Sequence, residues 1–207
     1  MVSTLAICNS RPLRDLVVPL QRLNVITGAN GSGKSNIYRT LRLLADMAQG
    51  RVIPSLAREG SLQSTLWAGP ESISRAVRRR HHPVQGTARE QPVILRLGFS
   101  GDEFGHAIDL GLPSPSSSAF GHDPEIKHEC VSNAEVLRPS ALLVERRGPV
   151  VQSRGEDGEW SVLVQHLSTF DSMMTHCADP WNMPEMLPKR GQMRAWRFYG
   201  QFRSGAA

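Results

Sequence analysis

The sequence predicts an α/β protein in which a strand–loop–helix unit precedes a largely antiparallel sheet. An apolar, partly β-branched run over residues 23–27 leads directly into a glycine-rich loop, and a helical stripe of apolar residues follows that loop. From residue 93 onward, short apolar runs alternate with turn-forming residues, which is typical of hairpins. The first two observations predict one α/β unit, and the third predicts the sheet that follows it.

The N-terminal segment contains three short runs that each favour a strand over a helix. Residues 5–8 and 16–20 are apolar and partly β-branched, and the turn-prone sequence Asn9-Ser10-Arg11-Pro12 separates them. Residues 23–27 form the third run. We therefore expect three strands in this segment, the third of which ends at the glycine-rich loop.

The loop from Gly28 to Ser35 reads Gly-Ala-Asn-Gly-Ser-Gly-Lys-Ser and matches the pattern G-x-x-x-x-G-K-[ST] in full. Its glycines allow backbone N–H groups to turn toward anionic oxygens, and the N-terminus of the next helix adds a positive dipole end. Lys34 supplies a charge for the β and γ phosphates, and the Ser35 hydroxyl suits Mg²⁺, which prefers oxygen ligands. The pattern predicts a P-loop that binds ATP and Mg²⁺.

Apolar residues after the loop recur at spacings of one, three and four, which places them on one face of a helix. Gly50 follows the stripe, and a glycine there can adopt the left-handed conformation that ends helices. The stripe consists of Ile37, Leu41, Leu44, Ala45 and Ala48.

The remainder of the chain divides by composition. After the nucleotide-binding unit (1–50), we expect an irregular or helical connection (51–92), an antiparallel β lobe (93–166) and a helical tail (167–207) with a short helix over 193–202. Expected strands in the lobe are 93–99, 106–110, 125–131, 141–146, 150–154 and 160–165.

The stretch 23–36 resembles the N-terminal segment of RecF/SMC-like ATPases of the ABC superfamily, because its Asn-Gly-Ser-Gly-Lys-Ser-Asn core is more typical of them than of G proteins or kinases. The turn Asn9-Ser10-Arg11 is similar to a polar-basic turn near the nucleotide in that group, although Pro12 departs from it. The tail, with Glu185 and the aromatic residues of 196–199, looks like the middle of a bacterial family of AAA family ATPases related to RecF. The resemblance implies an ABC/RecF-like P-loop NTPase fold. The candidate nucleotide-binding residues are Gly28, Ala29, Asn30, Gly31, Ser32, Gly33, Lys34, Ser35, Asn36 and Arg11.

Hydrolysis in such enzymes needs a second strand that ends in Asp, usually followed by Glu. Asp109 and Glu145 each follow an apolar run, but we interpret both as ordinary residues of the lobe. Gln152 and Gln165 are the candidates for a metal-contacting glutamine, and the signature sequence and switch histidine that the family uses are not found. We therefore expect the N-terminal part of a longer ATPase, with an incomplete parallel sheet, exposed apolar edges, weak stability and little hydrolysis by this chain alone.

Three further stretches of the sequence each fit either a structural or a functional interpretation. The basic run 75–82 fits a solvated helix end or a phosphate-backbone contact. The stretch 122–130 fits an ordinary strand, with Ile126, His128 and Cys130 on one face, or a metal site. The aromatic and arginine residues of 181–203 fit packing of a helix on the sheet or stacking on bases.

Composition narrows the protein class. The net charge is +5, the three cysteines are widely spaced, and no run is long enough for a secretory leader or a bilayer span, so we expect a cytoplasmic protein. The resemblance implies dimerisation through the nucleotide site, with hydrolysis only in the complete dimer and roles in DNA repair, DNA maintenance or defence. The alternative is a truncated, non-hydrolysing paralogue that binds a partner protein or nucleic acid.

Overall fold

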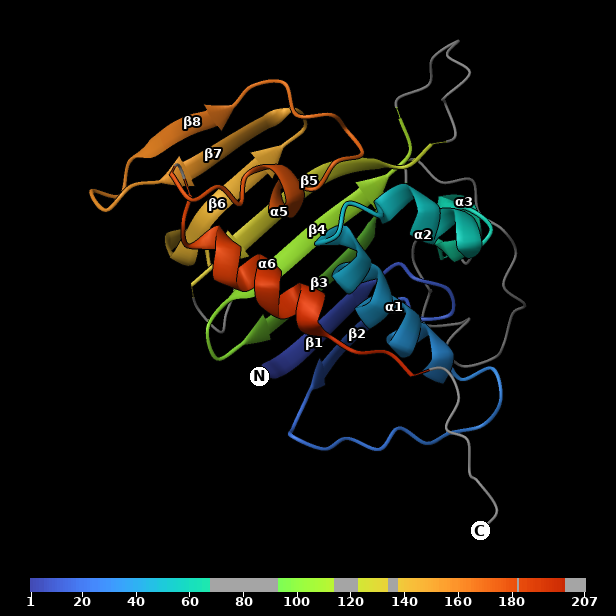
Figure 1. The fold of residues 1–207 in the computed structure, drawn as a ribbon. Helices are drawn as coiled ribbons and strands as arrows, with labels where there is room; N and C mark the ends of the chain where they lie inside the picture. The colour runs from blue at the N-terminus through green and yellow to red at the C-terminus, as the bar shows by residue number, and fades with distance from the viewer. Residues whose placement is uncertain (68–92, 114–122, 134–137, 182, 200–207) are drawn as a thin grey trace, which may run out of the picture.

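The computed structural model describes residues 1–67, 93–113, 123–133, 138–181 and 183–199. Within these residues, eight strands form one sheet in the order β2-β1-β3-β4-β5-β6-β7-β8. Each strand runs antiparallel to its neighbours, and Figure 1 shows the helices on one face of the sheet. The strands are β1 (Val2–Cys8), β2 (Asp15–Pro19), β3 (Leu95–Gly101), β4 (Gly105–Gly111), β5 (Glu125–Ser132), β6 (Leu142–Arg147), β7 (Val150–Arg154) and β8 (Trp160–Val164).

The predicted hairpins are confirmed, since β3 pairs with β4, β6 with β7, and β7 with β8. The alternating pattern explains the central strands: Leu95, Leu97 and Phe99 of β3 are buried beneath the helices, while Arg96 between them is exposed. Strand β1 pairs with both β2 and β3, so the N-terminal strands and those after residue 93 belong to the same sheet.

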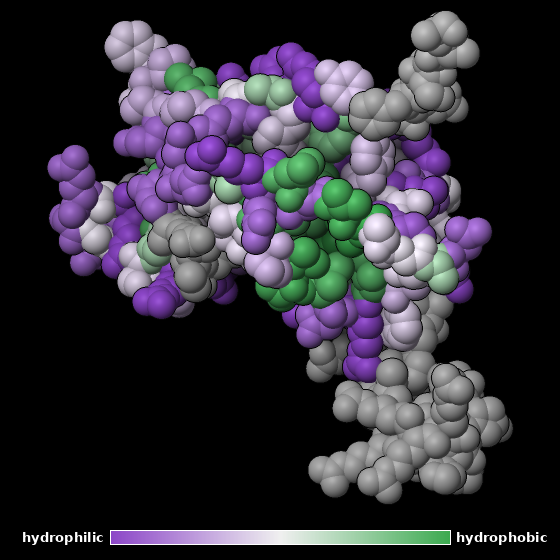
Figure 2. All heavy atoms as spheres, turned by 90° about the horizontal axis from the view of Figure 1, so that it is seen from below, coloured by the Kyte–Doolittle hydropathy of each residue, from purple (hydrophilic) through white to green (hydrophobic). Residues whose placement is uncertain are grey.

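The strand predicted over 23–27 is wrong. Residues 21–32, here called the exposed segment, lie outside the sheet, and Leu23 and Val25 are 82% and 80% exposed. Figure 1 shows this segment running along the lower side from β2 to α1, and Figure 2, viewed from below, shows hydrophobic residues gathered on that side. A strand needs a neighbouring backbone for its hydrogen bonds, and no strand lies beyond β2 in the described sheet to pair with residues 23–27. All strand pairs of this sheet are antiparallel, so the predicted parallel arrangement is absent from the described residues.

The helix predicted after the loop is confirmed as α1 (Lys34–Met47). Leu44 and Ala48 of its apolar stripe are buried, and Ile37 packs against the core from a partly buried position. Gly50 has a φ of 71°, and its N–H donates to the carbonyl of Met47 over 3.0 Å, so a left-handed glycine follows the end of the helix. The other helices are α2 (Val52–Arg58), α3 (Leu62–Thr65), the 3-10 helix η1 (Pro139–Ala141), α5 (Met173–His176) and α6 (Met186–Ala195).

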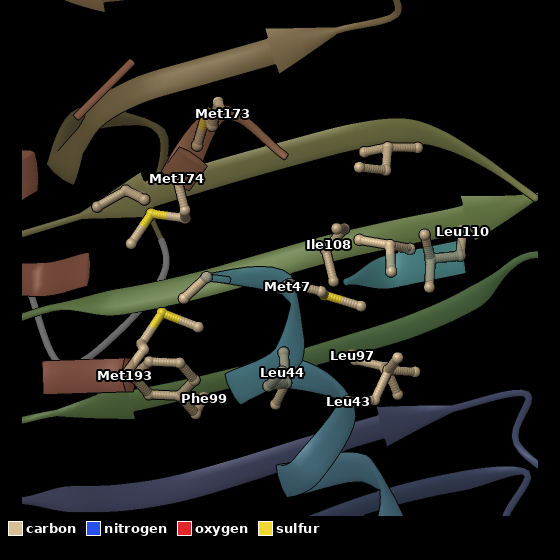
Figure 3. Close-up of a cluster of buried hydrophobic side chains, with 14 of the residues drawn as sticks. Leu43, Leu44, Met47, Leu97, Phe99, Ile108, Leu110, Met173, Met174 and Met193 are labelled. Atoms are coloured by element: carbon tan, nitrogen blue, oxygen red, sulfur yellow. The ribbon is translucent and has the colours of Figure 1, made fainter. Parts of the chain in front are cut away.

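The core lies between α1 and the middle of the sheet. Figure 3 shows Leu44 and Met47 of α1 beside Phe99 of β3 and Ile108 of β4, with Met193 of α6 close by. Burial of each large apolar side chain contributes about 1.5–3 kcal/mol. This packing fixes α1, and with it the position of the loop at its N-terminus.

A buried polar cluster attaches α5 to the sheet. His106 of β4 and Glu129 of β5 are fully buried, with 2.9 Å between Nε2 and Oε1, and the Ser172 hydroxyl donates to the same carboxylate over 2.5 Å. The backbone N–H of Met173 donates to the other oxygen over 2.9 Å. Burial raises the pKa of Glu129, but the hydrogen bonds from His106 and Ser172 outweigh it, so its pKa lies below the usual value.

The expected face pattern of β5 is also corrected. Leu110 pairs with Ile126 and Asp109 pairs with His128, so Lys127 is an extra residue in a bulge. Ile126 therefore joins the core on the face opposite His128 and Cys130. The predicted strand is present as β5, and among the described residues no group of three or more His, Cys, Asp or Glu side chains could hold a metal ion; His122 lies outside them.

The helix predicted over 193–202 is displaced, because α6 ends at Ala195. Pro188 occupies the third position of α6, where its missing N–H has no intrahelical partner to lose. After the helix, the Trp196 ring lies 5.0 Å from that of Phe99, which agrees with packing on the sheet, whereas Trp181 is 91% exposed. The basic run 75–82, the Ser/Pro-rich residues 114–118, and Phe202 and Arg203 lie outside the described residues.

In the part of the chain that the structure describes, no helix has the length and apolar character required to span a membrane.

Candidate functional site

The phosphate loop lies where the exposed segment meets α1. Gly28 to Ser32 are exposed, and α1 begins at Lys34, so the N-terminus of the helix directly follows an accessible loop. The opposite end of α1 is buried on the sheet. The packed part of the helix therefore positions an accessible N-terminus, which is the arrangement that anion binding requires.

Gly33 explains why the loop needs glycine directly before the helix. This residue caps α1 with a φ of 96°, a left-handed conformation that other residues rarely adopt. A Cβ atom there would lie 2.8 Å from Cδ2 of Leu13 and 3.4 Å from Cγ of Pro12. The glycine thus allows the loop to pack closely against the turn between β1 and β2.

The Lys34 side chain folds back over the loop. Its Nζ donates to the carbonyl of Gly28 over 2.5 Å and to that of Ala29 over 2.7 Å. An ammonium group has three donors, so these two hydrogen bonds hold the charge beside the loop while one donor remains for a ligand. The position fits the predicted role of Lys34 as a counter-charge for phosphates.

Ser35 is the second residue of α1 and is exposed. Asn36 follows, and its backbone N–H donates to the Gly33 carbonyl over 3.0 Å, which closes the first helical turn. A Mg²⁺ ion here would take the Ser35 hydroxyl together with phosphate oxygens and water, the ligand set that Mg²⁺ commonly uses. The hydroxyl therefore fits the group that the P-loop pattern implies.

Arg11, which the resemblance suggests as a nucleotide contact, precedes a residue that packs against the loop. It belongs to the turn between β1 and β2, and its backbone N–H donates to the carbonyl of Thr65 over 2.8 Å. The neighbouring Pro12 lies against Gly33. The fold thus brings the turn, the loop and the segment after α3 together, although they are far apart in the sequence.

The acidic and glutamine candidates lie on the sheet or directly after it: Asp109 on β4, Glu145 on β6, Gln152 on β7 and Gln165 just beyond β8. Asp109 forms an ion pair with Arg96 at 3.3 Å, and Glu145 binds His128 at 2.8 Å and Arg147 at 2.9 Å. Gln152 lies on β7, five strand positions from β1, which corresponds to about 24 Å across the sheet. Asp109 and Glu145 therefore lie on strands of the sheet, where each has an ion-pair partner.

A cavity of about 260 Å³ begins at Asn36, directly after the loop, and no pattern in the sequence predicts it. It runs along the side of α1 that faces α2, α3 and the β1–β2 turn, and both Pro12 and Asn36 line it. The only sequence signal was Arg39 and Arg42, three residues apart on α1. The cavity is also lined by Arg11, Arg39, Arg42, Arg58, Asp46 and Glu59.

Comparison with protein families gives a match over most of the chain. The family described as "AAA domain, putative AbiEii toxin, Type IV TA system" matches residues 23–203, which is well over half of the chain and includes the complete phosphate loop. No curated protein matched the sequence.

Proposed function

Since the chain belongs to this AAA-domain family and carries its nucleotide-binding, ATPase-type function, we propose that the loop Gly28–Ser35 binds ATP together with Mg²⁺. The observation that carries the proposal is the position of Lys34 and the loop N–H groups at the exposed N-terminus of a helix whose other end is buried. This geometry concentrates positive potential where a triphosphate would lie.

Each candidate residue has a defined part in the proposal. The loop backbone from Gly28 to Gly33 surrounds the phosphate oxygens, and Lys34 transfers its donors from the loop carbonyls to the β and γ phosphates. The hydroxyl of Ser35 holds Mg²⁺. Arg11 and Asn36 lie on the side of the loop that leads into the cavity, so they contact the part of the nucleotide beyond the β phosphate.

Binding of a fluorescent ATP analogue tests the proposal directly. We expect Lys34→Ala to abolish binding because it removes the only side-chain cation inside the loop. Lys189→Ala is the matched control, since Lys189 lies on α6 and donates to the carbonyl of Glu185. Equal affinity of the Lys34→Ala protein and the wild type would contradict the proposed site.

We further propose that this domain works as part of a RecF/SMC-like ATPase that dimerises through its nucleotide sites and acts on DNA in repair or defence. The support is the Asn-Gly-Ser-Gly-Lys-Ser-Asn core at Asn30–Asn36 and the net charge of +5. Size-exclusion chromatography with multi-angle light scattering, with and without Mg-ATP, would test dimerisation. A mass that stays monomeric in saturating ATP would contradict it.

The engagement of Asp109 and Glu145 on the sheet favours a second candidate function, that of a non-hydrolysing protein that binds a partner or nucleic acid. Phosphate release at high protein concentration separates the two. Turnover that disappears in Lys34→Ala would exclude the non-hydrolysing function. Salt-sensitive DNA binding without ATP would support the non-hydrolysing function.

A further inference from the structure

The cavity beside α1 contains more positive charge than its own carboxylates neutralise. Glu59 forms an ion pair with Arg39 at 3.3 Å. Asp46 accepts from Arg51 over 2.5 Å and from the hydroxyl of Ser55 over 2.5 Å. Both acidic groups of the cavity wall are therefore already paired.

Three guanidinium groups of the wall stay unpaired. Within the described residues, Arg11, Arg42 and Arg58 have no ion pair and no side-chain hydrogen bond, although each lines the same cavity. Like charges around one small volume repel each other. An anion placed between them is attracted to each guanidinium group and offsets that repulsion. Guanidinium groups also offer paired N–H donors that match the oxygens of a phosphate group.

The cavity extends well beyond the phosphate loop. Asn36 and Arg42 both line it and are six residues apart on α1, which corresponds to about 9 Å along the helix axis. Arg58 contributes from the last turn of α2 on the opposite wall. A group bound by Arg42 and Arg58 is thus separate from phosphates held at the loop, yet the two positions share one continuous surface through Asn36.

We propose that this cavity is a second phosphate-binding subsite, in which Arg11, Arg42 and Arg58 hold a phosphate monoester or pyrophosphate group in addition to those at the loop. Two sources share this chemistry. One is a further phosphate on the ribose of the bound nucleotide, a case that rests on the proposed function. The other is a separate small phosphate-bearing ligand, which does not.

The subsite is tested first with the loop disabled. Inorganic pyrophosphate is titrated calorimetrically into Lys34→Ala, and we expect saturable binding. Adding Arg42→Ala and Arg58→Ala should weaken pyrophosphate binding at least about tenfold, because the two substitutions remove the charge-assisted hydrogen bonds to the anion. Arg42→Lys with Arg58→Lys, which keeps the charge but not the paired donors, should give a smaller loss.

The matched control is Arg138→Ala with Arg194→Ala, because both arginines are exposed and neither lines the cavity. This pair removes the same charge and should leave pyrophosphate affinity within about twofold, as expected for screened surface charges. Absence of pyrophosphate binding to Lys34→Ala would overturn the proposal. An equal loss in the cavity and control pairs would overturn it as well.

The source of the phosphate is tested in the wild type. If the nucleotide supplies it, adenosine 3′-phosphate 5′-triphosphate should bind about tenfold tighter than ATP, and Arg42→Ala with Arg58→Ala should remove the gain. If a separate ligand supplies it, the gain is absent and pyrophosphate still binds the ATP-saturated protein. If the affinity gain is absent and pyrophosphate also fails to bind the ATP-saturated protein, the proposed subsite is wrong. Failure of the proposed function shows separately, as ATP affinity unchanged in Lys34→Ala.

Discussion

Two stretches of this chain carry similar apolar residues and adopt different structures. Leu95–Phe99 forms part of β3, with β1 and β4 on either side and α1 above it. The run 23–27 lies in the exposed segment and pairs with no strand in the described residues. The difference shows that an apolar run becomes a strand only when a neighbouring backbone and a covering layer are available.

Stability and ligand binding depend on different parts of this molecule. The sheet and its helices contain nearly all the buried apolar side chains, while the phosphate loop belongs to the part with the least burial. Substitutions in the sheet should therefore change the free energy of unfolding, and substitutions in the exposed segment and loop should change ligand binding instead.

The largest expected effect lies in the buried polar cluster. Glu129→Ala should lower the free energy of unfolding by about 3–5 kcal/mol, because it leaves His106 and Ser172 buried without their common partner. Urea unfolding followed by circular dichroism measures this change. Glu156→Ala, in the exposed turn between β7 and β8, is the control and should change stability by less than about 0.5 kcal/mol. Similar values for both variants would contradict a structural role for the cluster.

A pair of leucines tests the comparison itself. Leu44→Ala in α1 should cost about 2–5 kcal/mol because it creates a cavity between the helix and the sheet. Leu23→Ala removes the same atoms from a side chain that is almost fully exposed and should cost less than about 0.5 kcal/mol. If both substitutions destabilised the protein equally, the exposed segment would be packed in solution, and the contrast drawn between the two regions would be wrong.

Ligand binding at the loop should raise the stability of the whole folded protein. At about 100 times its dissociation constant, Mg-ATP should stabilise the wild type by about 2.7 kcal/mol, because it binds only the folded state. The increase in thermal midpoint should be absent in Lys34→Ala and retained in Lys189→Ala. A shift that persisted in Lys34→Ala would place nucleotide binding away from the loop.

The smallest expected effect is the pH dependence of the cluster. The pKa of Glu129 is below its ordinary value of 4.5, so the unfolded chain binds this proton more readily than the folded chain. The resulting stability is present above that value and is lost as the pH falls through the folded pKa. Glu129→Gln should therefore lose less stability than the wild type between neutral and acidic pH. Urea midpoints over that range measure the difference, and parallel curves would contradict it.

Local patterns in the sequence determined much of this protein. The glycine-rich loop, the helix that follows it and the strands of the sheet depend on backbone conformation and on side-chain spacing within short stretches, so α1 and the strands β1 to β8 could be predicted from their residues. The candidate loop residues follow from the same local pattern, whereas Arg11 is a candidate only through the family resemblance.

Only the tertiary structure decided the remaining features. Whether residues 23–27 pair with another strand, whether Lys127 is an extra residue in a bulge, and which partners His106 finds all depend on segments distant in the sequence. The arginine-lined cavity likewise forms only when α1, α2 and the β1–β2 turn pack together. Pairing, register and enclosed volume are properties of several segments at once, and for that physical reason no single stretch of residues encodes them.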